Sequence, residues 1–353
     1  MVMNHGDFKK RLWITILCSI FVVGLLFIYV PQAASAPKVI KWNVSLWGGP
    51  RGWTYPFERF AKDMESLTNG RWQITLHYGG ALAPPKEQLD GIKGGMFEAC
   101  HFCTAYAPGK LPLHSVMELP FICPDKPLDL SLMFEAMWEH PALLKELERW
   151  NAVPLLPGTI CTYNLMGNKR LDTVEDFKGA RIRIGGEIGR ALRMFGAVPT
   201  LMPVPELYES VDKGTVDLAG LPWSFAFGAF KIHEVSKYAI VGLNLGTMAC
   251  SYIANKKAFN ALPEEFKKIH RQWYEKAPYE WGKEYDALNR KWIEEVFKKR
   301  LEFIEFPPEE RAKLVKKAKT IWEEWVKKWE KKGLPAREVL DYYLSKRKEI
   351  AGY

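Results

Sequence analysis

Cysteine is scarce in this chain, with 6 residues among 353. That number is far too small for a disulfide scaffold. With 48% hydrophobic and 26% charged residues, the composition also excludes a disordered or collagen-like chain. The length exceeds the usual size of one domain, so two domains with sizeable cores are expected. The composition therefore predicts a globular protein.

Catalytic signatures are missing too. The sequence contains no G-x-S-x-G, no H-E-x-x-H and no P-loop. Its seven histidines are scattered, and the glycine-rich stretch at 185–189 lacks the first glycine of a dinucleotide fingerprint because Ile184 stands there. We therefore expect no enzymatic activity, no cofactor and no metal.

The excess of positive charge is confined to the two ends of the chain. Of the net +9, residues 1–36 carry +2 and residues 256–353 carry +7, so that 37–255 is close to neutral. In the C-terminal part acids and bases alternate, as at Glu323 and Lys327, which is typical of a solvated helix surface. Because no basic-aromatic motif accompanies the charge, we expect no nucleic-acid binding.

Residues 1–36 have the pattern of an export signal. A basic stretch that ends at Arg11 precedes an apolar run at 12–30, and small residues follow. The run is long enough to span a bilayer, so a cleaved signal peptide and an uncleaved anchor both fit. In either case the remainder lies outside the cytoplasm.

Export leaves five cysteines. Cys100 and Cys103 have redox C-x-x-C spacing, but they lie in a β-prone stretch, where residues three apart point to opposite faces. We interpret them as small buried residues. A disulfide between Cys161 and Cys250 stays open at this point. The fifth cysteine is Cys123.

Two successive α/β patterns predict two lobes with a ligand cleft between them. In the first, strands are expected at 39–46, 72–78 and around Cys100, with helices at 54–67 and 86–93. The second runs from 153 to 218, and the chain is expected to be helical from Pro263 onward, with Trp322, Trp325 and Trp329 as a packing stripe. The expected bounds are 37–160 plus about 252–295 for lobe I, 161–251 for lobe II, and about 296–353 for C-terminal helices that pack on the lobes.

Arg181 and Arg183 are the candidate anion-binding residues. Strand alternation places both on one face, ahead of a glycine pair at a helix start where backbone N–H groups stabilise anions. A guanidinium in a cleft can hold a carboxylate through two parallel hydrogen bonds. The residues alone fit equally well with two solvated arginines on an edge strand.

Several motifs carry a family resemblance. They are Asp-Phe-Lys-Gly-Ala-Arg-Ile-Arg-Ile at 176–184, Phe-Gly-Ala-Val-Pro at 195–199, Met-Pro-Val-Pro-Glu-Leu-Tyr-Glu at 202–209, Lys-Gly-Thr-Val-Asp at 213–217, and Glu-Leu-Pro-Phe-Ile at 118–122. In this order they resemble the solute-binding proteins of tripartite ATP-independent periplasmic (TRAP) transporters, of the DctP type. The resemblance implies a two-lobed periplasmic binding protein fold, with crossing hinge strands and a long spanning helix. It further implies a protein, which we expect to be monomeric, that closes on an organic acid and delivers it to the small and large membrane subunits.

The resemblance also implies which residues bind the ligand. The family's carboxylate-binding arginine maps onto Arg183, and a second family arginine maps onto Tyr163. A polar Gln-Glu-Asn set has become Ala-Gly-Leu at 219–221. Fewer polar groups favour a monocarboxylate with an apolar or aromatic body. A C4-dicarboxylate or an amino acid as ligand, or a periplasmic sensor or enzyme of the same fold, stays open. Candidate walls and a polar contact are Trp47, Trp53, Tyr106, Trp223, Phe227 and Asn244.

Overall fold

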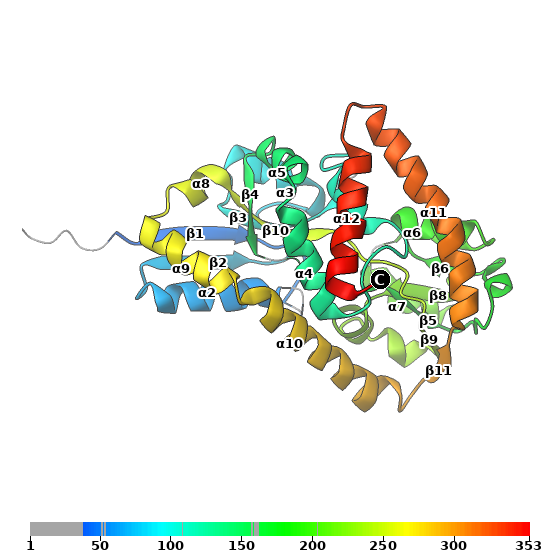
Figure 1. Cartoon of the computed structure of the whole chain (residues 1–353). Helices are drawn as coiled ribbons and strands as arrows, with labels where there is room; N and C mark the ends of the chain where they lie inside the picture. The colour runs from blue at the N-terminus through cyan, green and yellow to red at the C-terminus, as the bar shows by residue number, and fades with distance from the viewer. Residues whose placement is uncertain are drawn as a thin grey trace, which may run out of the picture. The chain divides into compact units, whose positions relative to one another are not determined.

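The computed structural model describes residues 38–50, 52, 54–107, 109–156, 158, 162–202 and 204–353. The predicted export segment, Trp53 and Cys161 lie outside these residues. One compact unit extends from Lys41 to Tyr353 (Figure 1). Within the described ranges, no helix combines the length and the apolar character that crossing a membrane requires.

The first lobe is built on a five-stranded sheet with the order β2-β1-β3-β10-β4. Strands β1 and β3 are parallel, whereas β10 is antiparallel to both β3 and β4. The strands are β1 (Ile40–Ser45), β2 (Trp72–His77), β3 (Ala99–Cys103), β4 (Ala152–Leu156) and β10 (Cys250–Asn255).

Helices cover this sheet with their apolar faces. On α2 (Tyr55–Leu67), Phe57, Phe60 and Met64 are fully buried, as the spacing along a helix face requires. Phe60 packs edge-on against Trp72 of β2. The other helices around this sheet are α3 (Gln88–Gly94), α4 (Pro127–Trp138), α5 (Pro141–Glu148), α8 (Lys256–Asn260) and α9 (Glu264–Tyr274).

The second lobe is built on a six-stranded sheet with the order β11-β9-β5-β8-β6-β7. Its strands are β5 (Asn164–Gly167), β6 (Arg181–Arg183), β7 (Val198–Thr200), β8 (Leu218–Leu221), β9 (Tyr238–Val241) and β11 (Glu302–Glu305); α6 (Gly186–Arg193) and α7 (Leu207–Asp212) belong to the same lobe. The prediction that the chain is helical throughout from Pro263 onward is wrong at β11. This strand forms because residues 302–305 pair in parallel with β9.

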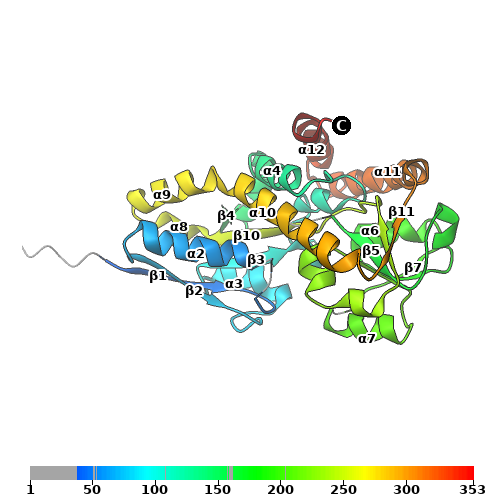
Figure 2. The ribbon, with the colours of Figure 1, turned by 90° about the horizontal axis from the view of Figure 1, so that it is seen from below.

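The chain passes from the first lobe to the second between β4 and β5, and it returns through residues 242–249 between β9 and β10. The long helix α10 (Ala277–Trp292) extends from the first lobe toward the second (Figure 2). It packs closely against α4, and the π-helical turn η8 (Ile293–Phe297) continues it toward β11. The predicted α/β fold with two lobes is thus confirmed.

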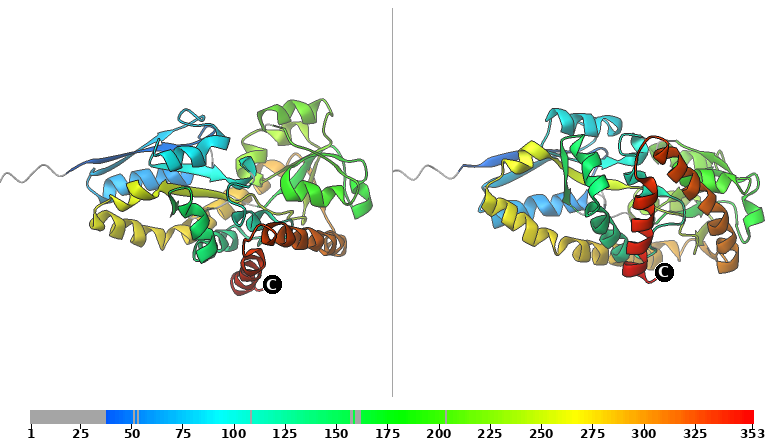
Figure 3. Two further views of the ribbon diagram at one scale, coloured as in Figure 1. Left: turned by 90° about the horizontal axis from the view of Figure 1, so that it is seen from above. Right: turned by 45° about the horizontal axis from the view of Figure 1, so that its top comes forward.

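Two C-terminal helices lie across the molecule (Figure 3). The first, α11 (Pro308–Glu330), packs against α6, and the second, α12 (Ala336–Ala351), packs against α4. The tryptophan stripe of α11 is buried, and the indole N–H of Trp322 donates to the Pro120 carbonyl at 3.0 Å. The stripe therefore packs in the core, as its spacing predicts.

The crossing of α10 and α4 depends on Gly282. A Cβ at this position would lie 2.5 Å from the Leu128 Cα, which is backbone and cannot rotate away. We expect Gly282→Ala to lower the free energy of unfolding by about 1–3 kcal/mol, the usual range for overpacking. Gly94→Ala is the matched control, since a Cβ there meets nothing within 4 Å. Denaturant unfolding of the two variants checks this; equal stability would contradict the tight crossing.

Candidate functional site

The candidate ligand-binding positions lie near one edge of each sheet. In the second lobe β6 and β8 are parallel and β5 is antiparallel to β8, so the ends of β6 and β8 and the start of β5 meet at one edge. In the first lobe the ends of β1 and β3 meet the start of β10 in the same way. Strand ends of this kind are where open α/β sheets bind ligands. The crossing segment 242–249, which returns the chain from the second lobe to the first, joins these two edges.

Arg183 is the last residue of β6 and is 7% exposed. Its Nε and Nη2 donate to the Met202 carbonyl at 3.2 and 2.9 Å. Among the described residues it has no carboxylate partner. Burial lowers the pKa of Arg183, the direction expected of a cation removed from water without an anion beside it. A buried unpaired guanidinium is unfavourable by itself, so it points to an anionic partner.

Arg181 has a different environment. Its side chain is half exposed and forms a salt bridge with Asp217 at 2.5 Å. The same carboxylate accepts the Arg181 backbone N–H at 2.7 Å. Arg181 thus already has its anion, and of the two arginines Arg183 is the one with capacity for a ligand.

Two tyrosines share the environment of Arg183. Tyr163 lies just before β5 and is 8% exposed, and Tyr106 ends the 3₁₀ turn η2 (Thr104–Tyr106) of the first lobe. Burial raises the pKa of Tyr163 above its usual range, Tyr106 raises it further, and Arg183 acts in the opposite direction. The structure therefore brings together Arg183, Tyr163 and Tyr106, from both lobes.

Trp47 extends this group on the side of the first lobe. Its ring meets that of Tyr106 edge-on, with centroids 4.9 Å apart, and stacks on His101 at 5.4 Å. The His101 ring in turn lies 5.0 Å from that of Tyr252. Trp47 and Tyr106 thus form an aromatic surface near Arg183, and the rings of His101 and Tyr252 support it from behind.

Three further candidates lie in other surroundings. Trp223 opens the π-helical turn η6 (Trp223–Gly228) and packs on Phe227, which is fully buried. The same tryptophan stacks on Phe303 of β11. Asn244 lies in the crossing segment, where Thr162 Oγ1 donates to its Oδ1 at 3.4 Å. These contacts belong to the second lobe and the crossing, and none of them joins Arg183.

The lack of polar side chains at the end of β8 has a structural reason. A Cβ on Gly220 would lie 2.7 Å from Ile184 Cδ1 and 3.2 Å from the Arg183 carbonyl oxygen. Ala219 and Leu221 on either side are buried. The end of β8 beside Arg183 is therefore apolar and closely packed.

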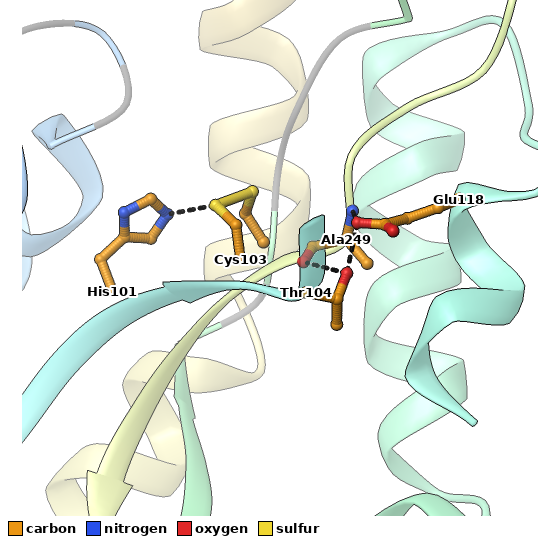
Figure 4. Close-up of a disulfide and its surroundings, with 6 residues drawn as sticks. His101, Cys103, Thr104, Glu118 and Ala249 are labelled. Carbon is orange, nitrogen blue, oxygen red and sulfur yellow. Dashed lines mark hydrogen bonds between the residues drawn. A yellow bond between two sulfur atoms is a disulfide. The ribbon is translucent and has the colours of Figure 1, made fainter. Parts of the chain in front are cut away.

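Sequence reasoning missed Glu118, which closes the 3₁₀ turn η3 (His114–Glu118). Its Oε1 accepts from the Ala249 N–H at 3.0 Å and from the Thr104 hydroxyl (Figure 4). Burial raises the pKa of Glu118 to about 7, against the lowering effect of these hydrogen bonds. The sequence showed this residue only within the Glu-Leu-Pro-Phe-Ile motif, which says nothing of its neighbours.

A disulfide joins Cys103 and Cys250, which face each other across β3 and β10 (Figure 4). The open question of the Cys250 partner is thereby answered, since Cys250 is bonded to Cys103 and not to Cys161. The interpretation of Cys103 as only a small buried residue is wrong. Cys100 is free and buried, as interpreted. His101 Nε2 lies 3.9 Å from Cys103 Sγ. The three side chains resemble a metal-ligand group, but with the sulfurs bonded to each other no thiolate is present to hold a metal.

The fold is that of a two-lobed binding protein. The family model of bacterial extracellular solute-binding protein family 7 (DctP) matches residues 53–328, and the chain belongs to this family.

Individual proteins of known name or structure are similar to the chain. A monocarboxylate 2-oxoacid-binding periplasmic protein of Nostoc sp. is 27% identical over 72% of this chain and 71% of its own. A TRAP periplasmic solute-binding protein of Desulfovibrio salexigens has a TM-score of 0.79 at 23% identity, covering 89% of this chain and 97% of its own. A TRAP solute-binding protein of Rhodoferax ferrireducens, in complex with copurified benzoate, has a TM-score of 0.76 at 21% identity, covering 89% and 99%. These findings establish a transporter solute-binding protein and not an enzyme.

Proposed function

We propose that this chain captures a monocarboxylate with an apolar or aromatic body between its two lobes and delivers it to the membrane subunits of a TRAP transporter. The observation that carries the proposal is Arg183, a buried guanidinium with no carboxylate partner among the described residues. A ligand carboxylate supplies that partner, and closure of the lobes removes the pair from water, which strengthens it.

The surroundings of Arg183 support a single carboxylate. Tyr163 stands where many relatives have a second arginine, so this site holds one strong cation rather than two. Trp47 and Tyr106 offer aromatic surface, and the end of β8 is apolar. Two of the similar proteins bind comparable molecules, one having copurified with benzoate and one being named for 2-oxoacids. Micromolar affinity would correspond to about 8 kcal/mol.

A thermal-shift screen tests the ligand class. We expect benzoate, phenylacetate or a branched 2-oxoacid to raise the unfolding temperature, since a ligand at about 100 times its Kd stabilises the folded state by about 2.7 kcal/mol. Succinate and glutamate, as a dicarboxylate and an amino acid, are the comparison ligands. Stabilisation by these two alone would contradict the proposal. Mass spectrometry of whatever copurifies with the protein gives an independent identification.

A further inference from the structure

The crossing segment 242–249 has a backbone that cannot pair as a regular strand. Positive φ angles occur at Gly242 (78°), Asn244 (42°) and Gly246 (140°). A β-strand needs negative φ at every residue. The buried carbonyl groups of this segment therefore need hydrogen-bond donors that do not belong to a sheet.

The same segment holds one residue of the candidate site by its backbone. The Leu245 N–H donates to the Tyr163 carbonyl at 3.0 Å, and the Tyr163 N–H donates to the Gly246 carbonyl at 2.8 Å. Tyr163 and Arg183 share one environment, in which each acts on the charge of the other. A displacement of residues 243–246 would therefore displace Tyr163 from its place near Arg183.

Arg311, in the first turn of α11, supplies one of the donors that the segment needs. Its Nε donates to the Leu243 carbonyl at 2.8 Å. Leu243 is fully buried. A hydrogen bond from a charged donor is stronger than one between neutral groups, and its loss leaves a buried acceptor without this partner.

The same guanidinium faces the loop between η3 and α4. Arg311 Nη2 lies 3.9 Å from Asp125 Oδ1, and its Cζ lies 5.8 Å from the centroid of the Phe121 ring. The Phe121 N–H in turn donates to the Leu245 carbonyl at 2.9 Å. The loop leads into α4 of the first lobe, whereas α11 packs against α6 of the second. Arg311 thus contacts the crossing segment and elements that belong to both lobes.

We propose, on the basis of the proposed function, that Arg311 is a positioning residue for ligand capture. It holds the crossing segment 242–249 in the conformation that places Tyr163 near Arg183, and it thereby slows release of the ligand. The lobes cannot move apart without a change in this segment, because it is one of the connections between them. A donor that fixes the Leu243 carbonyl opposes such a change.

Arg311→Ala should weaken the binding of benzoate about 3- to 30-fold, the range for residues that act on a site through packed neighbours. We expect most of the change in the dissociation rate, since differences between variants of one binding site lie mainly there. Arg311→Lys keeps the charge and one donor but loses the planar fork, so its Kd should lie between the two. Calorimetry gives the Kd of each protein, and stopped-flow fluorescence gives the two rates.

Arg347→Ala is the matched control. Arg347 also belongs to a C-terminal helix and also donates to a backbone carbonyl, that of Ile122 at 3.0 Å. Its other contacts are with Tyr353, so its partners lie off the crossing segment. Its loss should leave the Kd of benzoate within about twofold of wild type.

Amide hydrogen exchange tests the same assignment without a ligand. In Arg311→Ala the amides of Leu245 and Tyr163 should exchange about tenfold faster than in wild type, because the segment that they join opens more easily. In Arg347→Ala these two amides should exchange at the wild-type rate. Arg311→Lys serves for this comparison if the alanine variant folds poorly.

The outcomes separate the two proposals. If Arg311→Ala releases benzoate no faster than wild type, or if Arg347→Ala weakens binding to the same extent, Arg311 does not position the site, although the proposed function stands. If benzoate does not bind wild-type protein, the proposed function fails for aromatic acids. Hydrogen exchange then decides the role of Arg311, and unchanged exchange at Leu245 and Tyr163 would overturn it.

Discussion

Replacing Arg183 by alanine is expected to lower the affinity for a monocarboxylate by at least about 100-fold. Truncating one partner of a buried, hydrogen-bonded charge pair costs about 2–5 kcal/mol, because the other charge is left buried and unpaired. Here that other charge is the carboxylate of the ligand. Calorimetry with the ligand found in the screen measures the loss.

The stability of the ligand-free variant provides a second test of the same assignment. Because Arg183 has no anionic partner among the described residues, its removal breaks no ion pair and relieves a buried charge. We therefore expect Arg183→Ala to unfold at the same denaturant concentration as wild type, or a higher one. A lysine at this position would keep the charge but lose the planar fork, so Arg183→Lys should bind the ligand weakly.

Arg181→Ala is the matched control. Arg181 is half exposed and pairs with Asp217, and surface pairs of this kind contribute about 0–1 kcal/mol. Its loss should leave affinity within about twofold of wild type. If Arg183→Ala binds as tightly as Arg181→Ala does, the carboxylate anchor lies elsewhere.

The order of strands and helices could be predicted because it depends on local periodicity. The apolar face of α2 and the helix that follows the glycine pair at 185–186 are found where the sequence places them. Strand β11 was missed because it has only four residues, with a glutamate at each end. It is a strand only because it pairs with β9.

The site could be predicted in part, for a similar reason. Arg183 could be proposed as the carboxylate anchor because a strand, a glycine pair and a family motif coincide at one place in the sequence. Glu118 was not found, since burial raises its pKa and its hydrogen-bond partners Thr104 and Ala249 lie far apart in the sequence. Trp223 and Phe227 were proposed as pocket walls from their aromatic side chains alone. In the structure they pack on each other, and Trp223 also packs on Phe303.

The disulfide could not be predicted, because its two cysteines are 147 residues apart and only the register of β3 against β10 sets them opposite each other.

Loss of this disulfide is expected to lower the free energy of unfolding by about 5 kcal/mol. A cross-link that closes so long a loop removes much conformational freedom from the unfolded chain, and chain-entropy arguments give about this value for a separation of 147 residues. The double variant Cys103→Ala/Cys250→Ala avoids leaving a single unpaired thiol. Its midpoint in guanidinium chloride should fall well below that of wild type, and a phosphine reductant should lower the wild-type midpoint in the same way.

Cys100→Ala and Cys123→Ala are the matched controls, since both thiols are buried and free. Each removes one small buried group and should cost about 1 kcal/mol, with the sensitivity to reductant retained. Peptide mass mapping without reduction should recover the peptide of Cys103 linked to that of Cys250. A Cys161–Cys250 peptide, or a double variant as stable as wild type, would show that no disulfide joins β3 to β10.

The disulfide also fixes the strand that leads into Tyr106 to the strand that follows Ala249. The double variant should therefore bind its ligand more weakly than either control.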